Sequence, residues 1–222
     1  MNRTSARSGG ERLSADDLRA RRRAARAADN RVDILDAAER VFAERGLVEG
    51  SLREIASQSG FSTAAIYNYF ENKQQLFAET LSRRGVALLE VIERSAGDAN
   101  EPMAKLHAIV DGAVGFFETY PDFRRMLRHV RESDTTIPAV ITEYASDRLD
   151  AFTQSVALMI GVIEDGQADG TIRAGASSAL LHFYMTLVYE HVFLATPDNP
   201  AAALALDEFH DLIDGALRRP AT

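Results

Sequence analysis

Cysteine and tryptophan are both absent from this sequence of 222 residues. Without cysteine the chain has no disulfide framework, no thiolate nucleophile and no cysteine-ligated metal. Its histidines form no HExxH pattern, and no two of them lie four residues apart, so no metal site is predicted. They are His107, His129, His182, His191 and His210. A glycine-rich phosphate loop, a G-x-S-x-G motif and recognisably paired carboxylates are missing too. The sequence therefore predicts neither an enzyme nor a bound cofactor.

Long hydrophobic runs are also scarce. The apolar stretch from Ala179 to Ala195 has 17 residues and includes His182, Glu190 and His191, whereas a spanning helix needs about 20 apolar residues. A targeting peptide would need an apolar core after the basic N-terminal residues, and none follows them. We therefore expect no membrane partner and a cytoplasmic protein.

Acidic residues outnumber basic ones over the whole chain, giving a formal net charge of −8, but the imbalance is uneven. Residues 1–84 hold 15 Lys and Arg residues against 12 Asp and Glu residues, whereas residues 85–222 hold 10 against 21. A basic head on an acidic body favours a protein that contacts DNA at one end.

Residues 1–29 contain a cluster of arginines, namely Arg19, Arg21, Arg22, Arg23 and Arg26. We interpret this segment as a flexible basic arm that follows the phosphate backbone or enters a minor groove. The alternative is a disordered or fraying helical tail whose arginines only aid solubility.

The stretch from Ser51 to Lys73 has the pattern of two short helices joined by a tight turn. Ser51 and Glu54 have the spacing of a capping box, which predicts a helix start at Ser51. Gly60 can take the positive φ needed where that helix stops, and Ser62 is an N-cap candidate for the second helix. This pattern predicts a helix-turn-helix element that lies in a DNA groove.

The second helix of this element has two faces at 3.6 residues per turn. The side chains predicted to face the core are Ile66, Tyr69 and Phe70. The small, polar and aromatic residues that point outward are Thr63, Ala64, Tyr67 and Asn68. A recognition helix presents such a strip to base edges and phosphates. Asn72 and Gln75 form another cap pair, so a further helix is expected from Lys73.

A longer set of residues between Arg31 and Leu81 carries a family signature. It consists of Ile34-Leu35-Asp36-Ala37-Ala38, Phe42 with Gly46, Leu52-Arg53-Glu54-Ile55-Ala56, Gly60 and Ile66-Tyr67-Asn68-Tyr69-Phe70-Glu71-Asn72-Lys73. With these residues the stretch resembles the DNA-binding domain of the TetR (tetracycline-repressor-like) family of bacterial transcriptional regulators. The resemblance implies an all-helical fold, with a three-helix DNA-reading head at residues 30–76. A larger helical-bundle body at residues 77–222 would dimerise and hold a small ligand.

By this resemblance the DNA contacts are Ser51, Ser62, Thr63, Ala64, Ala65, Tyr67, Asn68 and Lys73. Tyr67 is expected to contact phosphate or sugar, Asn68 to read a base edge, and Lys73 to clamp a phosphate at a helix N-terminus. The alternatives are a half-buried aromatic for Tyr67 and a solvated surface lysine for Lys73. Family members often carry a lysine or arginine where this chain has Thr63, and a hydroxyl residue where it has Ala65.

Apolar periodicity, caps and prolines predict the remaining helices. They are expected at Arg31–Arg45 with Gly46 as the terminating residue, from Lys73 to about Arg94, from Pro102, at Phe123–Val130, from Pro138 to about Glu164, at Ser177–Ala195, and from Asn199-Pro200 to near Arg219. Residues 165–170 are expected to form a turn. The last two helices are expected to make a four-helix interface with those of a second subunit. Such a homodimer would place two heads about one DNA turn apart.

The body is rich in aromatic and thioether side chains of the kind that line a ligand cavity. They are Phe116, Phe117, Tyr120, Phe123, Met126, Phe152, Met159, Tyr184, Met185 and Tyr189. For any single one of them, a place in an ordinary core is the stronger interpretation.

Our main hypothesis is a homodimeric repressor that an apolar or amphipathic small molecule releases from a near-palindromic, double-stranded DNA operator. The alternative is a DNA-binding dimer without a small ligand, controlled by a protein partner or acting architecturally. An enclosed apolar cavity would favour the first hypothesis, and a fully filled core would favour the second.

Overall fold

The computed structural model describes residues 15–132, 140, 143–144, 146–194 and 204–220. This part of the chain is almost entirely helical, and an isolated bridge between Ile172 and Arg218 is its only β-type pairing. The helices are α1 (Ala15–Glu49), α2 (Leu52–Ser59), α3 (Thr63–Ile66), α4 (Lys73–Gly97), α5 (Pro102–Thr119), α6 (Pro121–Glu132), α8 (Ser146–Asp169), α9 (Ser177–Leu194) and α10 (Leu206–Leu217). The predicted all-helical fold is confirmed.

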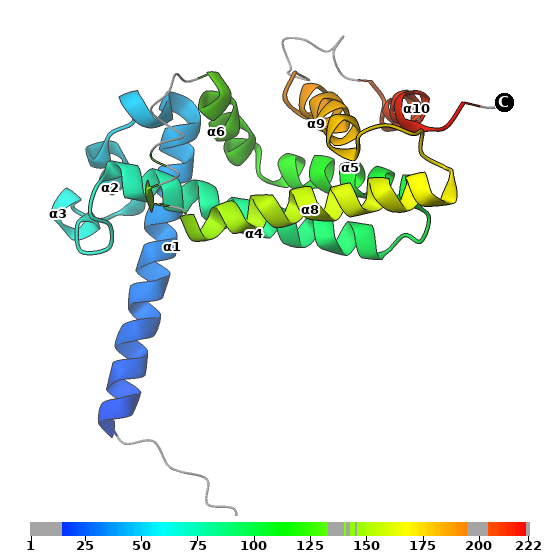
Figure 1. Cartoon of the computed structure of the whole chain (residues 1–222). Coiled ribbons are helices and arrows are strands. Elements are labelled where there is room, and N and C mark those ends of the chain that lie inside the picture. Colours follow the sequence, from blue (N-terminus) through cyan, green and yellow to red (C-terminus); the bar gives the residue numbers. More distant parts are fainter. Residues whose placement is uncertain (1–14, 133–139, 141–142, 145, 195–203, 221–222) are drawn as a thin grey trace, which may run out of the picture.

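The helices form an elongated molecule with α2 and α3 at one end and α9 and α10 at the other (Figure 1). The long helix α4 runs between the two ends and packs against α5 and α8. At the head, α6 packs against α1. The body therefore meets the head along two helices, α4 and α6.

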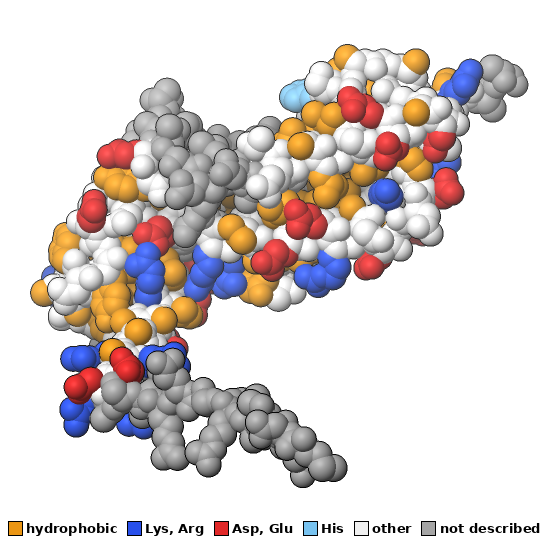
Figure 2. All heavy atoms as spheres, turned by 60° about the horizontal axis from the view of Figure 1, so that its bottom comes forward, with side chains coloured by type: hydrophobic (Ala, Val, Ile, Leu, Met, Phe, Trp, Pro, Cys, Tyr) orange, Lys and Arg blue, Asp and Glu red, His pale blue; other side chains and the backbone are white. Residues whose placement is uncertain are grey.

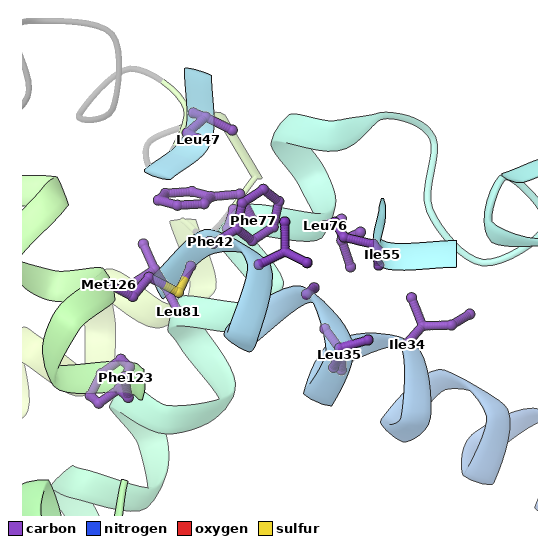
Figure 3. Close-up of a cluster of buried hydrophobic side chains, with 14 of the residues drawn as sticks. Ile34, Leu35, Phe42, Leu47, Ile55, Leu76, Phe77, Leu81, Phe123 and Met126 are labelled. Atoms are coloured by element: carbon purple, nitrogen blue, oxygen red, sulfur yellow. The ribbon is translucent and has the colours of Figure 1, made fainter. Parts of the chain in front are cut away.

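The core of the head is built from α1, α2 and α4, each of which presents apolar side chains at helical spacing. Phe42 of α1, Ile55 of α2 and Phe77 of α4 are fully buried. The rings of Phe42 and Phe77 meet edge to face, with 5.0 Å between their centroids. Figure 3 shows that this first core continues to Phe123 and Met126 of α6. Head and adjoining body therefore share one hydrophobic core, and the predicted boundary between residues 76 and 77 lies inside it.

A second core occupies the far half of the body, where α5, α8, α9 and α10 meet. Tyr184 of α9 is fully buried there, and its hydroxyl donates a hydrogen bond to the carbonyl oxygen of Leu106 at 2.8 Å. Burial raises the pKa of the Tyr184 hydroxyl well above its ordinary value, so the hydroxyl remains a donor.

An ion-pair network joins α1 to α4 at the edge of the first core. The Glu39 side chain is only 5% exposed, and its carboxylate accepts hydrogen bonds from Arg83 Nη2 at 2.9 Å and Arg84 Nε at 2.8 Å. Arg83 Nη2 also donates to Asp36 Oδ1 at 2.6 Å. The Arg84 guanidinium lies 4.0 Å from the centroid of the Tyr120 ring. The network thus ties α1, α4 and the end of α5 together.

The N-terminal segment differs from the sequence prediction. A flexible arm is predicted over residues 1–29, but residues 15–29 are helical and continuous with the first helix of the head. Composition explains the difference, because alanine and arginine, both strong helix formers, fill most of this segment. All residues from Arg19 to Asp29 are exposed, and the helix projects away from the head (Figure 1). Residues 1–14 lie outside the described part.

The turn predicted over residues 165–170 is also wrong for most of its length, because α8 continues to Asp169. Gly166 serves close packing instead of a turn. A Cβ at this position would come within 2.6 Å of the Ile172 side chain and 3.0 Å of Pro102. The chain turns at Gly170, whose φ is 82°.

Other predicted boundaries are close to the observed ones. Gly46 takes a φ of 68°, but a further helical turn follows it up to Glu49. The last helix begins at Leu206, so residues 204–205, which were predicted to be helical, precede it. The starts predicted at Pro138 and at Asn199-Pro200, together with Ala195, lie outside the described residues.

The apolar helix α9 keeps polar side chains along its length, including the exposed His182 and the half-buried Glu190. Within the described residues, no helix combines the length and the apolar character that crossing a membrane requires.

Candidate nucleic-acid interface

Two serine caps and a left-handed glycine fix the turn between α2 and α3. The hydroxyl oxygens of Ser51 and Ser62 each accept the backbone amide three residues on, at 3.2 and 3.1 Å. Gly60 ends α2 with a φ of 76°, a conformation that costs residues with a Cβ roughly 1–2 kcal/mol. The Glu54 carboxylate of the predicted capping box pairs instead with Arg45 Nε at 3.0 Å.

The helix α3 is a single turn, but helical hydrogen bonding continues beyond it. The backbone amides of Tyr69 and Phe70 both donate to the carbonyl oxygen of Ile66, at 2.9 and 3.0 Å. Ile66 and Phe70 are buried in the first core, so the segment is anchored at two positions one turn apart. We call residues 62–70 the recognition element.

Two residues of α1 hold the end of the recognition element. Asn30 Nδ2 donates to the Tyr69 hydroxyl at 3.0 Å, and Arg31 Nη1 donates to the Tyr69 carbonyl oxygen at 2.9 Å. Arg31 also pairs with Glu79 of α4, and its guanidinium lies 4.4 Å from the centroid of the Phe70 ring. Arg31 therefore positions the recognition element relative to α4. Local sequence patterns give no signal for these contacts, because the partners lie 38 to 48 positions apart.

Lys73, predicted to clamp a phosphate, makes two contacts within the protein. Its Nζ donates to the carbonyl oxygens of Val48 and Gly50, at 3.0 and 2.9 Å. The lysine thereby fastens the start of α4 to the end of α1 and to the residue that follows it. An ammonium group has three N–H donors, so one remains for a phosphate.

The predicted contact residues differ in exposure. Ser51, Ser62, Ala64, Tyr67 and Asn68 are exposed, whereas Thr63, Ala65 and Lys73 are half-buried. Tyr67 is 55% exposed, and its hydroxyl has no hydrogen-bond partner in the described part of the chain. The serine hydroxyls that accept cap bonds keep their own hydrogen for donation to a phosphate. The exposed amide of Asn68 and the methyl of Ala64 suit base-edge contacts.

Arg53 is a further candidate on this surface. It is exposed in the first turn of α2, two positions after Ser51, and among the described residues it makes no ion pair. Arg45 and Arg40 of α1 are engaged, by Glu54 and by Gln58. The only sequence signal for Arg53 is its place inside the Leu52–Ala56 motif.

The residues predicted to line a ligand cavity divide between the two cores. Phe116, Phe117, Tyr120, Phe123, Met126 and Tyr189 belong to or pack against the first core. Met159, Tyr184 and Met185 belong to or pack against the second core. Phe152 joins neither, because it is 63% exposed on α8.

An aromatic cluster (Phe116, Phe117, Phe123, Tyr189 and Phe193) lies where α5, α6 and α9 meet. Phe117 stacks on Phe123 at 5.8 Å between centroids and meets Phe193 edge to face at 5.2 Å. Phe193 also stacks on Tyr189 at 4.3 Å. Phe193 is absent from the sequence prediction, although it lies one helical turn from Tyr189.

Two surface hollows in the described part of the chain lie beside these residues rather than among them. One, of about 270 Å³, lies by the Glu39 network and is lined by Asp36, Glu39, Arg40, Arg84, Thr119, Tyr120, Pro121 and Asp122. The other, a groove of about 490 Å³ along α9 and α10, is lined by Arg173, Leu180, Phe183, Leu187, Asp211, Leu212, Gly215 and Ala216. Of the predicted ligand residues, only Tyr120 lines either of these two hollows.

Two stacked histidines link α5 to α10. The rings of His107 and His210 lie 4.2 Å apart, with His107 Nε2 2.9 Å from Asp214 Oδ1 and His210 Nε2 2.8 Å from Asp111 Oδ1. Burial, and next the neighbouring His210, lower the pKa of His107; burial is also the main cause that lowers the pKa of His191. The described residues contain no group of three or more side chains placed to hold a metal ion.

Residues 34–80 match the family model described as "Bacterial regulatory proteins, tetR family". The HTH-type transcriptional repressor BepR of Brucella suis biovar 1 is 37% identical over 100 residues, which are 45% of this chain and 48% of BepR. The chain thus spans about half the length of that relative. The HTH-type transcriptional repressor AcnR of Corynebacterium efficiens is 23% identical over 192 residues, which are 86% of this chain and 94% of AcnR.

The fold is shared with solved structures. The transcriptional regulator FadR from Bacillus subtilis, in complex with stearoyl-CoA, has a TM-score of 0.68 and 19% identity, covering 83% of this chain and 95% of FadR. The family match runs from α1 to α4 and contains the whole recognition element. Residues 34–80 therefore carry the sequence of the TetR family of bacterial regulatory proteins, and the chain as a whole shares the fold of a solved transcriptional regulator.

Proposed function

We propose that this protein is a dimeric transcriptional repressor whose recognition element reads operator DNA and which a small amphipathic ligand releases. One observation carries the proposal. The recognition element exposes Ala64, Tyr67 and Asn68 while Ile66 and Phe70 hold it in the first core. A helical segment anchored in this way can enter a major groove with its outer side chains at base edges. The repressors BepR and AcnR support repression as the outcome, in the cytoplasm, where the DNA lies.

Within this proposal the contacts divide into two classes. Asn68 and Ala64 read base edges, whereas the hydroxyls of Ser51, Ser62 and Tyr67 contact phosphates. Thr63 and Ala65, being half-buried, border this surface. Lys73 gives its remaining donor to a phosphate while holding the carbonyls of Val48 and Gly50.

The second copy of the chain would cover α9 and α10. Nine large hydrophobic side chains are exposed among the described residues, and four of them, Phe183, Leu204, Leu206 and Leu212, belong to or directly precede these two helices. Phe183 and Leu212 are 50% and 46% exposed and face the 490 Å³ groove. A twofold pairing of this face buries its apolar surface and leaves both heads free for one DNA duplex.

The ligand would enter the body near the aromatic cluster. FadR from Bacillus subtilis, which shares the fold, was solved with stearoyl-CoA, and this supports a ligand with an acyl chain. The cluster includes Phe123 of α6, and the same helix reaches the head, where His129 Nε2 lies 3.1 Å from the carbonyl oxygen of Ala43. A ligand acyl chain that separates these rings would move α6 against α1. The ligand shifts the equilibrium between the DNA-bound and released conformations only by its unequal affinity for the two.

A second candidate function has an observation in its favour. Phe116, Phe117 and Phe123 are nearly fully buried and pack on one another, so the first core has the character of a filled interior. This packing favours a DNA-binding dimer that is controlled by a protein partner or acts architecturally, without a small ligand.

DNA binding is tested first by selecting bound duplexes from a random-sequence library with the purified protein. We expect a near-palindromic consensus whose half-sites are about one DNA turn apart. Tyr67→Ala should weaken binding to the selected duplex, whereas Phe152→Ala, which removes an equally exposed aromatic from the body, should not. Failure to enrich any sequence would refute sequence-specific repression.

Dimerisation and ligand response need separate measurements. Phe183→Glu together with Leu212→Glu should give monomers in sedimentation velocity, and Phe152→Glu should remain dimeric. Stearoyl-CoA should release the protein from the selected duplex in fluorescence anisotropy, whereas coenzyme A alone should not. If a panel of acyl-CoA and fatty acid chain lengths leaves the complex intact, the ligand-independent alternative is favoured.

A further inference from the structure

The projecting part of α1 carries its arginines on one side. Arg19, Arg22, Arg23 and Arg26 fall at the i, i+3, i+4, i+7 spacing, so they lie within about 100° of one another around the helix axis. We call these four residues the arginine stripe. Figure 2 shows Lys and Arg side chains gathered on this projecting part of the molecule. Arg21 lies on another side of the helix.

The stripe faces the same side of α1 as the helix-turn-helix. Asn30 continues the stripe one turn beyond Arg26, and its amide donates to the Tyr69 hydroxyl at the end of the recognition element. Arg40, in the same angular sector, donates to Gln58 Oε1 of α2 at 3.2 Å. Because α1 is continuous from Ala15 to its kink at Gly46, the orientation fixed at these two residues extends to the stripe.

Within the described part of the chain, the arginine stripe makes a single ion pair, and that pair is exposed to solvent. Arg19 lies 3.3 Å from Asp16, with both side chains mostly exposed. Arg22, Arg23 and Arg26 make no ion pair with any described residue. Exposed like-charged side chains held in one row repel one another, and a polyanion relieves that repulsion.

We propose that the arginine stripe binds the phosphate backbone of the DNA duplex beyond the half-site that the recognition element reads, a role that rests on the proposed function. Arg19 stands eleven positions before Asn30, which is about 16 Å along the helix at 1.5 Å per residue. That reach is about half a turn of DNA. A lipid surface is a poorer partner, because the side opposite the stripe carries the charged Asp17 and Arg21 besides three alanines, and so lacks the large apolar face of a membrane-bound helix.

The test uses the full chain and the duplex selected by the wild-type protein, in a trimmed form and in a form extended by about one turn of unrelated sequence on each side. In the stripe variant, Arg19, Arg22, Arg23 and Arg26 are replaced by glutamine, which retains helix propensity. In the matched control, Arg94, Lys105, Arg125 and Arg219 of the body are replaced by glutamine, which removes the same number of positive charges. Far-ultraviolet circular dichroism checks that both remain folded.

The wild-type protein should bind the extended duplex more tightly than the trimmed one, and the stripe variant should lose that difference. The slope of log K against log salt should fall by up to about 3.6 per protomer in the stripe variant, at about 0.9 per lost phosphate contact. Hydroxyl-radical protection outside the half-sites should disappear while the selected consensus stays the same. A stripe variant with the slope and footprint of the body control would overturn the inference. If the wild-type protein bound all duplexes equally, with no sequence selectivity, the proposed function would be refuted instead.

Discussion

Replacing Glu39 by glutamine should lower the free energy of unfolding by about 2 kcal/mol. Breaking a buried ion pair from one side costs about 3–5 kcal/mol, because the other charge stays buried without its partner. Here the cost is reduced. The Arg83 and Arg84 side chains are 25% and 20% exposed, Arg83 keeps Asp36 at 2.6 Å, and Arg84 keeps the Tyr120 ring. Glutamine also retains one carbonyl oxygen that can accept from either arginine.

The measurement is urea unfolding followed by far-ultraviolet circular dichroism, at one fixed protomer concentration because dimerisation would make stability concentration-dependent. Asp36→Asn is the matched control. Its side chain is 44% exposed, so the loss should stay below about 1 kcal/mol and shrink in high salt. A loss of less than about 0.5 kcal/mol for Glu39→Gln, or equal losses for the two substitutions, would show that Glu39 does not hold these arginines as a buried partner.

Three further outcomes follow from contacts in the two cores and at the turn. Tyr184→Phe leaves the Leu106 carbonyl without its 2.8 Å donor and should cost about 1–2 kcal/mol in urea unfolding, whereas no loss would show that water replaces the bond. Gly60→Ala forces a Cβ residue to a φ of 76° and should lower the unfolding free energy by about 1 kcal/mol, which equal urea midpoints would contradict. The pKa values of His107 and His191 are lowered in the folded state, so the unfolded chain binds protons more readily and the unfolding free energy should fall as pH drops below 6.5. The plot of unfolding free energy against pH should be flatter for His107→Gln than for the wild-type protein. Parallel plots for the two proteins would exclude His107 as a source of the pH dependence.

Local features of the head could be predicted from the sequence because their causes are local. Ser51, Ser62 and Asn72 accept amides three residues on, and Gly60 takes the left-handed conformation, all within one turn of the residues that signal them. Apolar periodicity likewise predicted a helix over Arg31–Arg45 and one from Lys73, both of which are present in the structure. The projecting helix was missed because its charge, rather than the helix propensity of its alanines and arginines, determined the prediction.

The contacts that position the recognition element could not be predicted, because they join distant segments. Arg31 meets Tyr69 and Glu79, and Lys73 meets the carbonyls of Val48 and Gly50, over 23 to 48 positions. Apolar composition likewise marks Phe116 and Met159 as buried but does not say that they belong to different cores. Phe152 shows the same limit, since an aromatic on an amphipathic helix can also face solvent.

The contacts of Arg31 and Lys73 have a mechanical consequence for the head. They fasten the recognition element and the end of α1 to α4, so the head would turn as one piece with that helix. With 25 residues, α4 is about 37 Å long, and a tilt of about 5° at its far end carries the head about 3 Å. In a symmetric pair the two displacements add to about 6 Å, nearly two base-pair steps of 3.4 Å. In the proposed dimer, a tilt of this size would put the two heads out of step with their half-sites.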